Sequence, residues 1–524
     1  MPHRIAQLLL QLGVLAVVVA VLPYKLFELD RYFVPKELVL HAVALLVMLL
    51  FLKRIRQVRV DAADALLALF LALSVASSLF ATNHWLAQRA LGVSVSCAVI
   101  FWAARSIGSS GSYRPLLVTA SVAVVAAAAA SLAQAYGVET DYFSLNRAPG
   151  GTFGNRNFIA HFSAIGLPVM IFTVVTARRS AGALLGSLAM AVVGAALVLS
   201  RSRAAWLAIT VSTGVLSVLL VVSRHRWRGQ KIGGRLSRLA LAALLGASVA
   251  IVLPNELNWR SDSPYLDSAR GLVDYRSGSG RGRVAQYVNS LEMAKAFPVL
   301  GVGPGNWPVH YPAFAPRGDR SLADDGMTAN PWPSSDWMAH VSERGAVAAI
   351  ALLGVFAALF TAALRRWSTL TSTDDLLAKI TLAATITATL VVSAFDAVLL
   401  LAAPALLAWT VIGATAGVAR AGREVALPGA VGVTAVSILL LVALASVTRS
   451  AAQTVAITTV GTGGTRAGWN AAAAWDPGSY RINLRVAELH AARGRCSAAR
   501  PFARRALDLF PDAPTARRVL RRCS

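Results

Sequence analysis

Residues 183–222 read ALLGSLAMAVVGAALVLSRSRAAWLAITVSTGVLSVLLVV, and this stretch decides the fold. Two uncharged apolar runs, each close to the ~20 residues that cross a bilayer as a helix, are joined at Arg201 and Arg203. Backbone polar groups inside lipid must pair within their own segment, so each run is expected to form a transmembrane helix. The stretch therefore predicts a helical hairpin with two arginines at its tip.

The same pattern recurs along the whole chain. Of the 524 residues, 56% are hydrophobic and only 14% are charged, with a mean hydropathy of +0.60. This composition excludes a soluble globule, in which about a quarter of the residues are charged. We predict an all-α polytopic membrane protein with about eleven to thirteen transmembrane helices. The expected spans are 5–22, 38–52, 62–81, 86–104, 116–135, 157–177, 183–199, 204–222, 239–253, 337–363, 378–394, 397–417 and 429–447.

The net charge of +25 is interpreted by its position along the chain. Basic residues gather in every second short connection, as the positive-inside rule describes for cytoplasmic loops. The N-terminus is thus expected on the cytoplasmic side of the membrane, and the anchoring arginines are expected to contact membrane lipid. No nucleic-acid partner is expected. The basic connections contain Lys53, Arg54, Arg56, Arg59, Arg105, Arg114, Arg178, Arg179, Arg224, Arg226, Arg228, Lys231, Arg235, Arg238, Arg365, Arg366, Arg420 and Arg423.

Four parts follow from this topology: helices in 1–253, a large periplasmic loop in 254–336, further helices in 337–447, and a periplasmic tail in 448–524. A loop of this length inside a compact protein is usually functional. The tail repeats AAAWDP as ALDLFP about 34 residues later, which resembles the tetratricopeptide helix pair. So short a repeat buries little alone, so we expect it to dock on the membrane part or on a protein partner.

The three cysteines divide according to this topology. Cys97 lies within a span and is expected to be an inert, small hydrophobic residue. Cys496 and Cys523 both lie in the tail, and in an oxidising periplasm they are predicted to form a disulfide. No Cys or His spacing typical of a metal site occurs, and no metal or other cofactor is expected.

Polar residues at the outer ends of spans are the candidate binding groups. Arg201 and Arg203 stand at a short external turn, and arginine grips phosphate groups bidentately. They are predicted to hold a lipid diphosphate, with snorkelling to lipid headgroups as the alternative. GGTFGNRNFIAHF, residues 150–162, brings Asn155 and Asn157 to the start of another span, where helix capping is the alternative.

Two further motifs border the large loop. GSGRGRVAQYVNSLEMAKAFPVLGVGPGNWPVHY, residues 278–311, predicts an amphipathic helix over 284–296 followed by a glycine-rich turn, which is neither a P-loop nor a dinucleotide-binding fingerprint. PSSDWMAHVSERGAV, residues 333–347, leads back into the membrane. It places Asp336, His340 and Glu343 on one helical face. Such a polar stripe is expected to face the protein interior or a cavity.

These motifs together resemble the O-antigen ligase and polymerase superfamily. GTFGNRN, LSRSRAAW, R-x3-Y-x5-M with PVLGVGPGNW-x3-Y, and SDW-x5-ERG occur in that order over roughly 150–350. The resemblance implies a glycosyltransferase of the inner membrane that takes a glycan from an undecaprenyl-diphosphate carrier on the periplasmic face. Its acceptor would be a glycan, lipid A core or a protein.

The resemblance also implies roles for individual residues. Arg201 or Arg203, and Arg283, fall on the family's arginines that bind the carrier diphosphate. Tyr287 stands where the family often has Trp, and the neighbouring Arg281 is a further substrate-binding candidate.

The general base is where the sequence departs from the family. The family's loop exit typically reads His-Asn-Asp/Glu and its histidine is the favoured base, but Ser334 occupies that position here. Asp336 is therefore our first candidate base, followed by His340 and then by His310, which is also a candidate for substrate binding.

The predicted reaction is metal-independent and inverting. An acceptor hydroxyl, deprotonated by the base, attacks the anomeric carbon while arginines stabilise the leaving diphosphate. A protein oligosaccharyltransferase acting on pilin is an alternative within the superfamily. A non-catalytic binder of lipid-linked glycans is another, as is a transporter, which would carry charged groups toward the middle of several spans. A fourth alternative is an assembly protein recruited through the tail.

Overall fold

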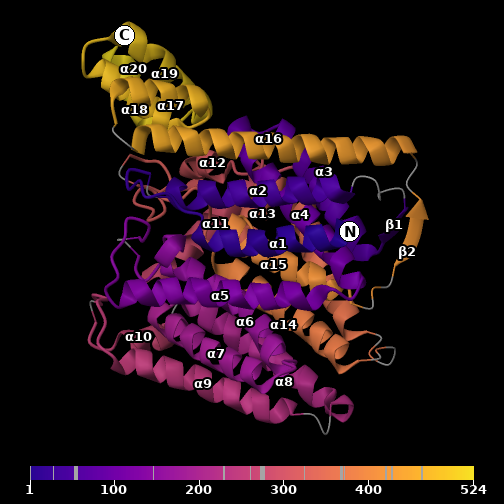
Figure 1. Ribbon diagram of the computed structural model, residues 1–524. Helices are drawn as coiled ribbons and strands as arrows, with labels where there is room; N and C mark the ends of the chain where they lie inside the picture. The colour runs from indigo at the N-terminus through magenta and orange to yellow at the C-terminus, as the bar shows by residue number, and fades with distance from the viewer. Residues whose placement is uncertain are drawn as a thin grey trace.

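The computed structural model describes residues 2–27, 29–51, 57–144, 147–227, 231–259, 261–271, 278–323, 325–365, 367, 370, 372–418, 420, 422–426, 429–461 and 464–523. The longer helices run side by side and form one membrane bundle (Figure 1). They are α1 Pro2–Val19, α2 Asp30–Phe51, α3 Ala62–Leu79, α4 His84–Ser109, α5 Tyr113–Ala135, α6 Arg156–Val175, α7 Ser180–Ser200, α8 Arg203–Val222, α9 Ile232–Val252, α13 Asp336–Leu364, α14 Thr373–Phe395, α15 Ala402–Ala416 and α16 Gly429–Gly461.

The bundle confirms the predicted fold class. Eleven helices within the described residues are long and apolar enough to cross a membrane, and the apolar helices His3–Val19 and Ala402–Ala416 are shorter. Most of the buried side chains form one continuous apolar core that spans the bundle. Two short 3-10 helices, Gly151–Phe153 and Arg224–Arg226, and the strands β1 Gln57–Val60 and β2 Arg423–Ala426 lie at its ends.

The helix α2 is longer than the expected span 38–52 because its first turns bury charged residues. Arg31 donates hydrogen bonds to the carbonyl oxygens of Asp141, at 2.6 Å, and Phe143, at 3.1 Å. The carboxylate of Glu37 pairs with Arg89 at 2.8 Å. Buried charges are tolerated only when they are paired or hydrogen-bonded. These partners come from other parts of the chain, so a local reading of the sequence placed 23–37 wholly outside the membrane.

The two ends of the bundle differ in character. At one end, which we call the strand end, β1 and β2 pair antiparallel with Val58 opposite Val425 (Figure 1). The short connections rich in basic residues belong to this end. The opposite end, which we call the loop end, carries the segment between α9 and α13. That segment contains α10 Pro264–Arg270, α11 Gly278–Ala296 and α12 Trp307–Phe314.

The glycine-rich turn of the loop and the SERG motif of α13 bind each other. The backbone N–H groups of Val302 and Gly303 donate to the carbonyl oxygens of Ser342, at 3.0 Å, and Glu343, at 2.9 Å. The Glu343 carboxylate in turn accepts from the N–H of Gly305 at 2.8 Å. These contacts interrupt α13 at Gly345, whose φ of 80° suits glycine. The two motifs therefore fix the loop to the bundle.

The tail packs against the loop end beside α16 (Figure 1). Helix α16 continues through the expected boundary at residue 448 as far as Gly461. Asn83, at the α3–α4 turn, donates from its amide to the carbonyl oxygen of Leu509 at 3.0 Å, and the tail thus docks on the membrane part. Its four helices are α17 Arg466–Trp475, α18 Tyr480–Ala491, α19 Cys496–Leu509 and α20 Pro514–Arg522.

The predicted disulfide is confirmed. Cys496, at the start of α19, is bonded to Cys523, directly after α20, with a Cα–Cα separation of 4.9 Å. Fully buried alanines between the helices, among them Ala487, Ala499 and Ala503, let these helices approach closely. Cys97 is a buried free cysteine in α4, as expected.

Candidate functional site

A large cavity of about 900 Å³ lies at the loop end of the bundle. Its wall is built from the start of α6, the α7–α8 turn, α10, the first turns of α11 and the segment before α13. Two carboxylates, those of Glu256 and Asp267, face six guanidinium groups, so the lining carries a surplus of positive charge. The arginines are Arg147, Arg156, Arg201, Arg203, Arg283 and Arg320.

Arg201 and Arg203 are held against α10 rather than spread toward lipid headgroups. Arg201 ends α7 with a left-handed backbone, φ 52°, and its Nε donates to the hydroxyl of Ser268 at 2.9 Å. Arg203 donates to the carbonyl oxygen of Gly271. Burial lowers the pKa of Arg201 and the charge of Asp267 raises it, yet a guanidinium stays protonated in proteins. The turn thus presents two fixed positive charges to the cavity.

An aromatic ring supports two of these cations. The guanidinium carbons of Arg156 and Arg201 lie 4.8 and 4.6 Å from the centroid of the Trp259 ring. Cation–π attraction of this kind offsets part of the repulsion between neighbouring arginines. Trp259 thereby helps to keep two like charges together in the absence of an anion.

A second cavity of about 370 Å³ adjoins the first. Six residues line both cavities, namely Arg147, Asn155, Asn157, Arg283, Asn330 and Ser334. The second cavity adds the rings of Tyr32, Phe33 and Trp332, the carboxylate of Asp396 and the guanidinium of Arg481. Apolar rings with a few polar groups are typical of small-molecule sites. The two cavities together offer room for an extended, anionic ligand.

The GTFGNRN motif caps a helix and also reaches the cavities. Asn155 caps α6 by accepting from the N–H of Asn157 at 3.0 Å, and both asparagines line the two cavities. Capping therefore fixes the position of the two amides at the cavity wall.

Asp336 has a structural environment. The residue is fully buried, and its two carboxylate oxygens accept hydrogen bonds from the backbone N–H groups of Val398, Leu399 and Leu400 at 2.8–3.3 Å. These contacts join the start of α13 to the connection between α14 and α15. Because the backbone occupies the carboxylate, the geometry does not favour Asp336 as a general base.

The two candidate histidines are engaged elsewhere. His340 contacts the Arg344 guanidinium through Nδ1 and packs edge-on against Phe70 with a centroid separation of 5.5 Å. The Nε2 of His310 lies 3.0 Å from the hydroxyl of Thr82. Burial lowers the pKa of His310, which Asp512 of the tail partly offsets. Both rings contribute to packing between elements.

Asp396 is the carboxylate that the geometry brings to the site, and it was missed as a candidate base. It follows the last turn of α14 and lines the second cavity together with Arg283 and Ser334. The sequence did carry a signal, because Asp396 interrupts an apolar region, and charged residues at membrane depth are functional candidates by default. Arg147, Arg156, Arg320 and Arg481 were also missed, since each stands in a polar segment where arginine is common.

The remaining candidates lie on α11. The Tyr287 hydroxyl is 2.8 Å from the carbonyl oxygens of both Ser334 and Ala394, so it ties α11 to the ends of α13 and α14. Arg281 is exposed on the first turns of α11. Tyr287 therefore positions the helix that carries Arg283.

Comparison with known proteins finds one family model that matches part of the chain. The family model described as O-antigen ligase matches residues 187–329. The matched segment contains Arg201, Arg203 and Arg283, together with most of the loop between α9 and α13. No curated protein matches the chain. The match supports a multi-pass membrane enzyme of the O-antigen ligase and polymerase type. Within the described residues, no three His, Cys, Asp or Glu side chains gather as a metal site.

Proposed function

We propose that this protein transfers or polymerises a glycan from an undecaprenyl-diphosphate-linked donor on the periplasmic face of the inner membrane. The observation that carries the proposal is the cavity at the loop end, where six arginines converge from separate elements. A diphosphate is the anionic group whose geometry suits several guanidinium groups at once. The family match covers the turn and the loop that supply four of these arginines, namely Arg201, Arg203, Arg283 and Arg320.

The two cavities would bind different parts of the substrates. Arg201 and Arg203 would bind the carrier diphosphate in the larger cavity, and Arg283, which lines both, would contact the phosphate nearest the sugar. The glycan and the acceptor would occupy the second cavity, against Tyr32 and Trp332. Fixed cations aimed at the charge that develops on a leaving group are usually the largest contribution to catalysis.

The reaction then needs one displacement. The acceptor hydroxyl gives its proton to the Asp396 carboxylate, and its oxygen bonds to the anomeric carbon from the face opposite the diphosphate. The bond between that carbon and the diphosphate oxygen breaks, and the electron pair leaves with the diphosphate. The arginines stabilise the added negative charge. Transfer inverts the anomeric configuration. Asp396 accepts the proton of the acceptor hydroxyl, and the arginines balance the negative charge of the leaving diphosphate.

The placement of charge favours this enzyme over a transporter. The arginines and Asp396 gather at one end of the bundle, whereas a transporter places its binding groups near the middle of the membrane. The acceptor stays open between a growing glycan, lipid A core and a protein such as pilin.

The test uses a deletion strain complemented with single variants. Arg203→Ala and Arg283→Ala are expected to lower glycan product by about 10²–10³-fold, the usual effect of removing one stabilising donor. Arg317→Ala removes an exposed arginine of the same loop that lies outside both cavities and should retain full activity. If the Arg203 and Arg283 variants, expressed equally, matched Arg317→Ala in product, the diphosphate clamp would be refuted.

The surface glycans of the deletion strain identify the outcome of transfer. Single repeat units on lipid A core would indicate a polymerase, and accumulation of carrier-linked polymer would indicate a ligase. Loss of glycan from pilin, with normal lipopolysaccharide, would indicate a protein oligosaccharyltransferase.

A further inference from the structure

A third, separate cavity lies at the strand end of the bundle, opposite the arginine-lined site. Its volume is about 430 Å³, within the range of small-molecule sites. It opens between the start of α3, the ends of α4, α13 and α15, and the start of α14. The lining contains four cations and a single carboxylate, that of Asp61. The cations are Arg105, Arg365, Lys379 and Arg420.

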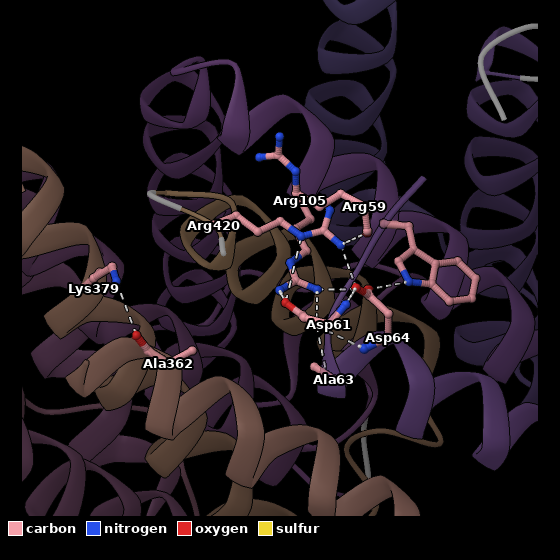
Figure 2. Close-up of polar contacts among 9 residues, drawn as sticks. Arg59, Asp61, Ala63, Asp64, Arg105, Ala362, Lys379 and Arg420 are labelled. Atoms are coloured by element: carbon pink, nitrogen blue, oxygen red, sulfur yellow. Dashed lines mark hydrogen bonds and ion pairs between the residues drawn. The ribbon is translucent and has the colours of Figure 1, made fainter. Parts of the chain in front are cut away.

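Salt bridges fix two of these cations in place. The Arg105 guanidinium is 2% exposed and pairs with both Asp61 and Asp64, at 2.9 Å from the latter (Figure 2). Arg420 reaches the same Asp64 carboxylate from the segment before β2. Burial alone would raise the pKa of Asp61, but the hydrogen bonds and charge of Arg105 lower it. Arg105 therefore favours the ionised form of the Asp61 carboxylate, and the salt bridges hold the cluster together.

The Nε atoms of the two arginines are enclosed. The Nε–H groups of Arg105 and Arg420 are buried and have no hydrogen-bond partner, although the Nε of Arg420 lies 3.9 Å from a carboxylate oxygen of Asp61. Both side chains line the cavity, so their charges border it while these two atoms stay covered.

Lys379 adds a third fixed charge. The residue is 5% exposed, and its ammonium donates to the carbonyl oxygen of Ala362 at 3.2 Å (Figure 2). It also donates to the carbonyl oxygen of Arg365 at 3.3 Å. These carbonyls belong to the end of α13, so the ammonium is held between that end and α14. Arg365 itself is exposed at the rim. Positive charge thus borders the cavity on both sides.

The rest of the wall is mostly apolar, with the two threonines Thr361 and Thr415 among alanine, leucine and valine side chains. Ala357, Ala358 and Leu359 of α13, with Leu382 of α14 and Val418 after α15, line the cavity below the charges. An occupant that matches this lining has an anionic head and an apolar chain. Inorganic phosphate matches only the head.

From this arrangement we infer that the strand-end cavity binds the phosphate headgroup of an anionic glycerophospholipid. The strand end carries the basic connections that the positive-inside rule places in the cytoplasm, where the membrane surface is negatively charged. Basic pockets between transmembrane helices on that side are suited to anionic lipid headgroups. The site is independent of the glycan chemistry proposed for the opposite end.

The test measures lipid retention by native mass spectrometry of the full-length protein in detergent, titrated with phosphatidylglycerol or with phosphatidylcholine. We expect the unsubstituted protein to bind phosphatidylglycerol selectively. Arg365→Gln with Lys379→Gln removes two charges from the cavity and should weaken this binding about 30-fold, since each basic group near an anionic surface contributes about a fivefold factor. Arg178→Gln, an exposed arginine of the α6–α7 connection, removes charge from the same end outside the cavity and should change little.

A second variant keeps every charge. Ala357 is exposed and lines the cavity, so Ala357→Trp should fill the space and abolish selective binding without disturbing the salt bridges. Equal phosphatidylglycerol retention in the unsubstituted protein and in both variants would overturn the site. If inorganic phosphate displaced bound phosphatidylglycerol as readily as added phosphatidylglycerol does, the assignment to a lipid would be overturned.

Discussion

Two aspartates near the loop end lie in different surroundings. Asp336 is enclosed, and three backbone N–H groups hold its carboxylate. Asp396 is partly exposed, and it lines the cavity that also holds Arg283. A carboxylate satisfied by backbone donors stabilises a fold, whereas one that borders a ligand cavity is free to accept a proton from a substrate.

This contrast predicts crossed effects of two matched substitutions. Asp396→Asn should lower the rate of glycan transfer by about 10²–10⁴-fold, because the general base is lost, while the unfolding temperature changes little. Asp336→Asn should instead lower the unfolding temperature, because an amide NH₂ would meet backbone donors. Product assays and thermal unfolding of both purified variants provide the measurements. Full activity of Asp396→Asn would remove that residue from the mechanism.

At this scale the sequence predicted the arginines better than the base. Arg201 and Arg203 stand out because charge at a membrane boundary requires an explanation. The hydrogen bonds from the backbone N–H groups of residues 398–400 to the Asp336 carboxylate depend on how α13 packs against the α14–α15 connection. Spacing along one helix carries no information about that contact.

Among the elements, α13 has the most unusual construction. Its first turns are fixed by the glycine-rich turn of the loop, and the helix is interrupted at Gly345. A Cβ atom at Gly345 would lie 2.0 Å from the carbonyl oxygen of Val299, which leaves no room for a side chain. The contact between the glycine-rich turn and the SERG motif of α13 thus fixes the loop to the bundle.

Substitutions of two glycines distinguish the effect of this tight contact on stability from the effect of helix propensity. Gly345→Ala should destabilise the protein by about 2–5 kcal/mol, because the new methyl group combines overpacking with a strained backbone. Gly214→Ala, in α8 where a Cβ atom meets nothing within 4 Å, should be neutral or stabilising by up to about 1 kcal/mol. Thermal unfolding in detergent compares them, and equal stability of the two variants would contradict the role given to Gly345.

The positions of the helices were largely predictable and their ends were not. Runs of apolar residues locate each span because lipid contact imposes them. The additional turns of α2 depend on partners such as Arg89 and the carbonyl oxygen of Phe143. The continuation of α16 to Gly461 follows from its packing against the tail.

In the whole molecule, the tail is part of the site as well as a neighbour of it. Arg481, on α18, lines the second cavity together with Arg147 and Arg283. The docking contacts of Asn83 and Trp85 with the tail therefore also set the position of a binding group. The tail is expected to influence which glycan or acceptor is accepted.

Separate alanine substitutions of two tail arginines test this role. Arg481→Ala should raise the KM for the glycan substrate at least about tenfold, the effect of losing one hydrogen bond to a charged group, with a small change in kcat. Arg485→Ala, one turn further along α18 and paired with Glu488, should leave both parameters near those of the unsubstituted protein. An unchanged KM for Arg481→Ala would separate the tail from substrate binding.

The disulfide is expected to stabilise the tail alone. Cys496 and Cys523 are 27 residues apart, and a loop of that length contributes about 3–4 kcal/mol through the entropy of the unfolded chain. Replacement of both by Ser should increase hydrogen exchange in α19 and α20, while amides in α6 and α14 keep their protection. Unchanged exchange in the tail would show that its packing suffices without the bond.

The pairing of β1 with β2 has a consequence for how the protein is made. Arg420 bonds to the carbonyl oxygen of Arg59 across 361 residues of intervening chain, and at about 5–20 residues per second the ribosome needs roughly 20–70 s to supply that partner. When that interval begins, only α1 and α2 are already synthesised, and α3 to α15 follow before Arg420 is made. The growing chain therefore stays in the membrane as an open bundle until its last helices are synthesised. The pairing of β1 with β2 then closes the strand end.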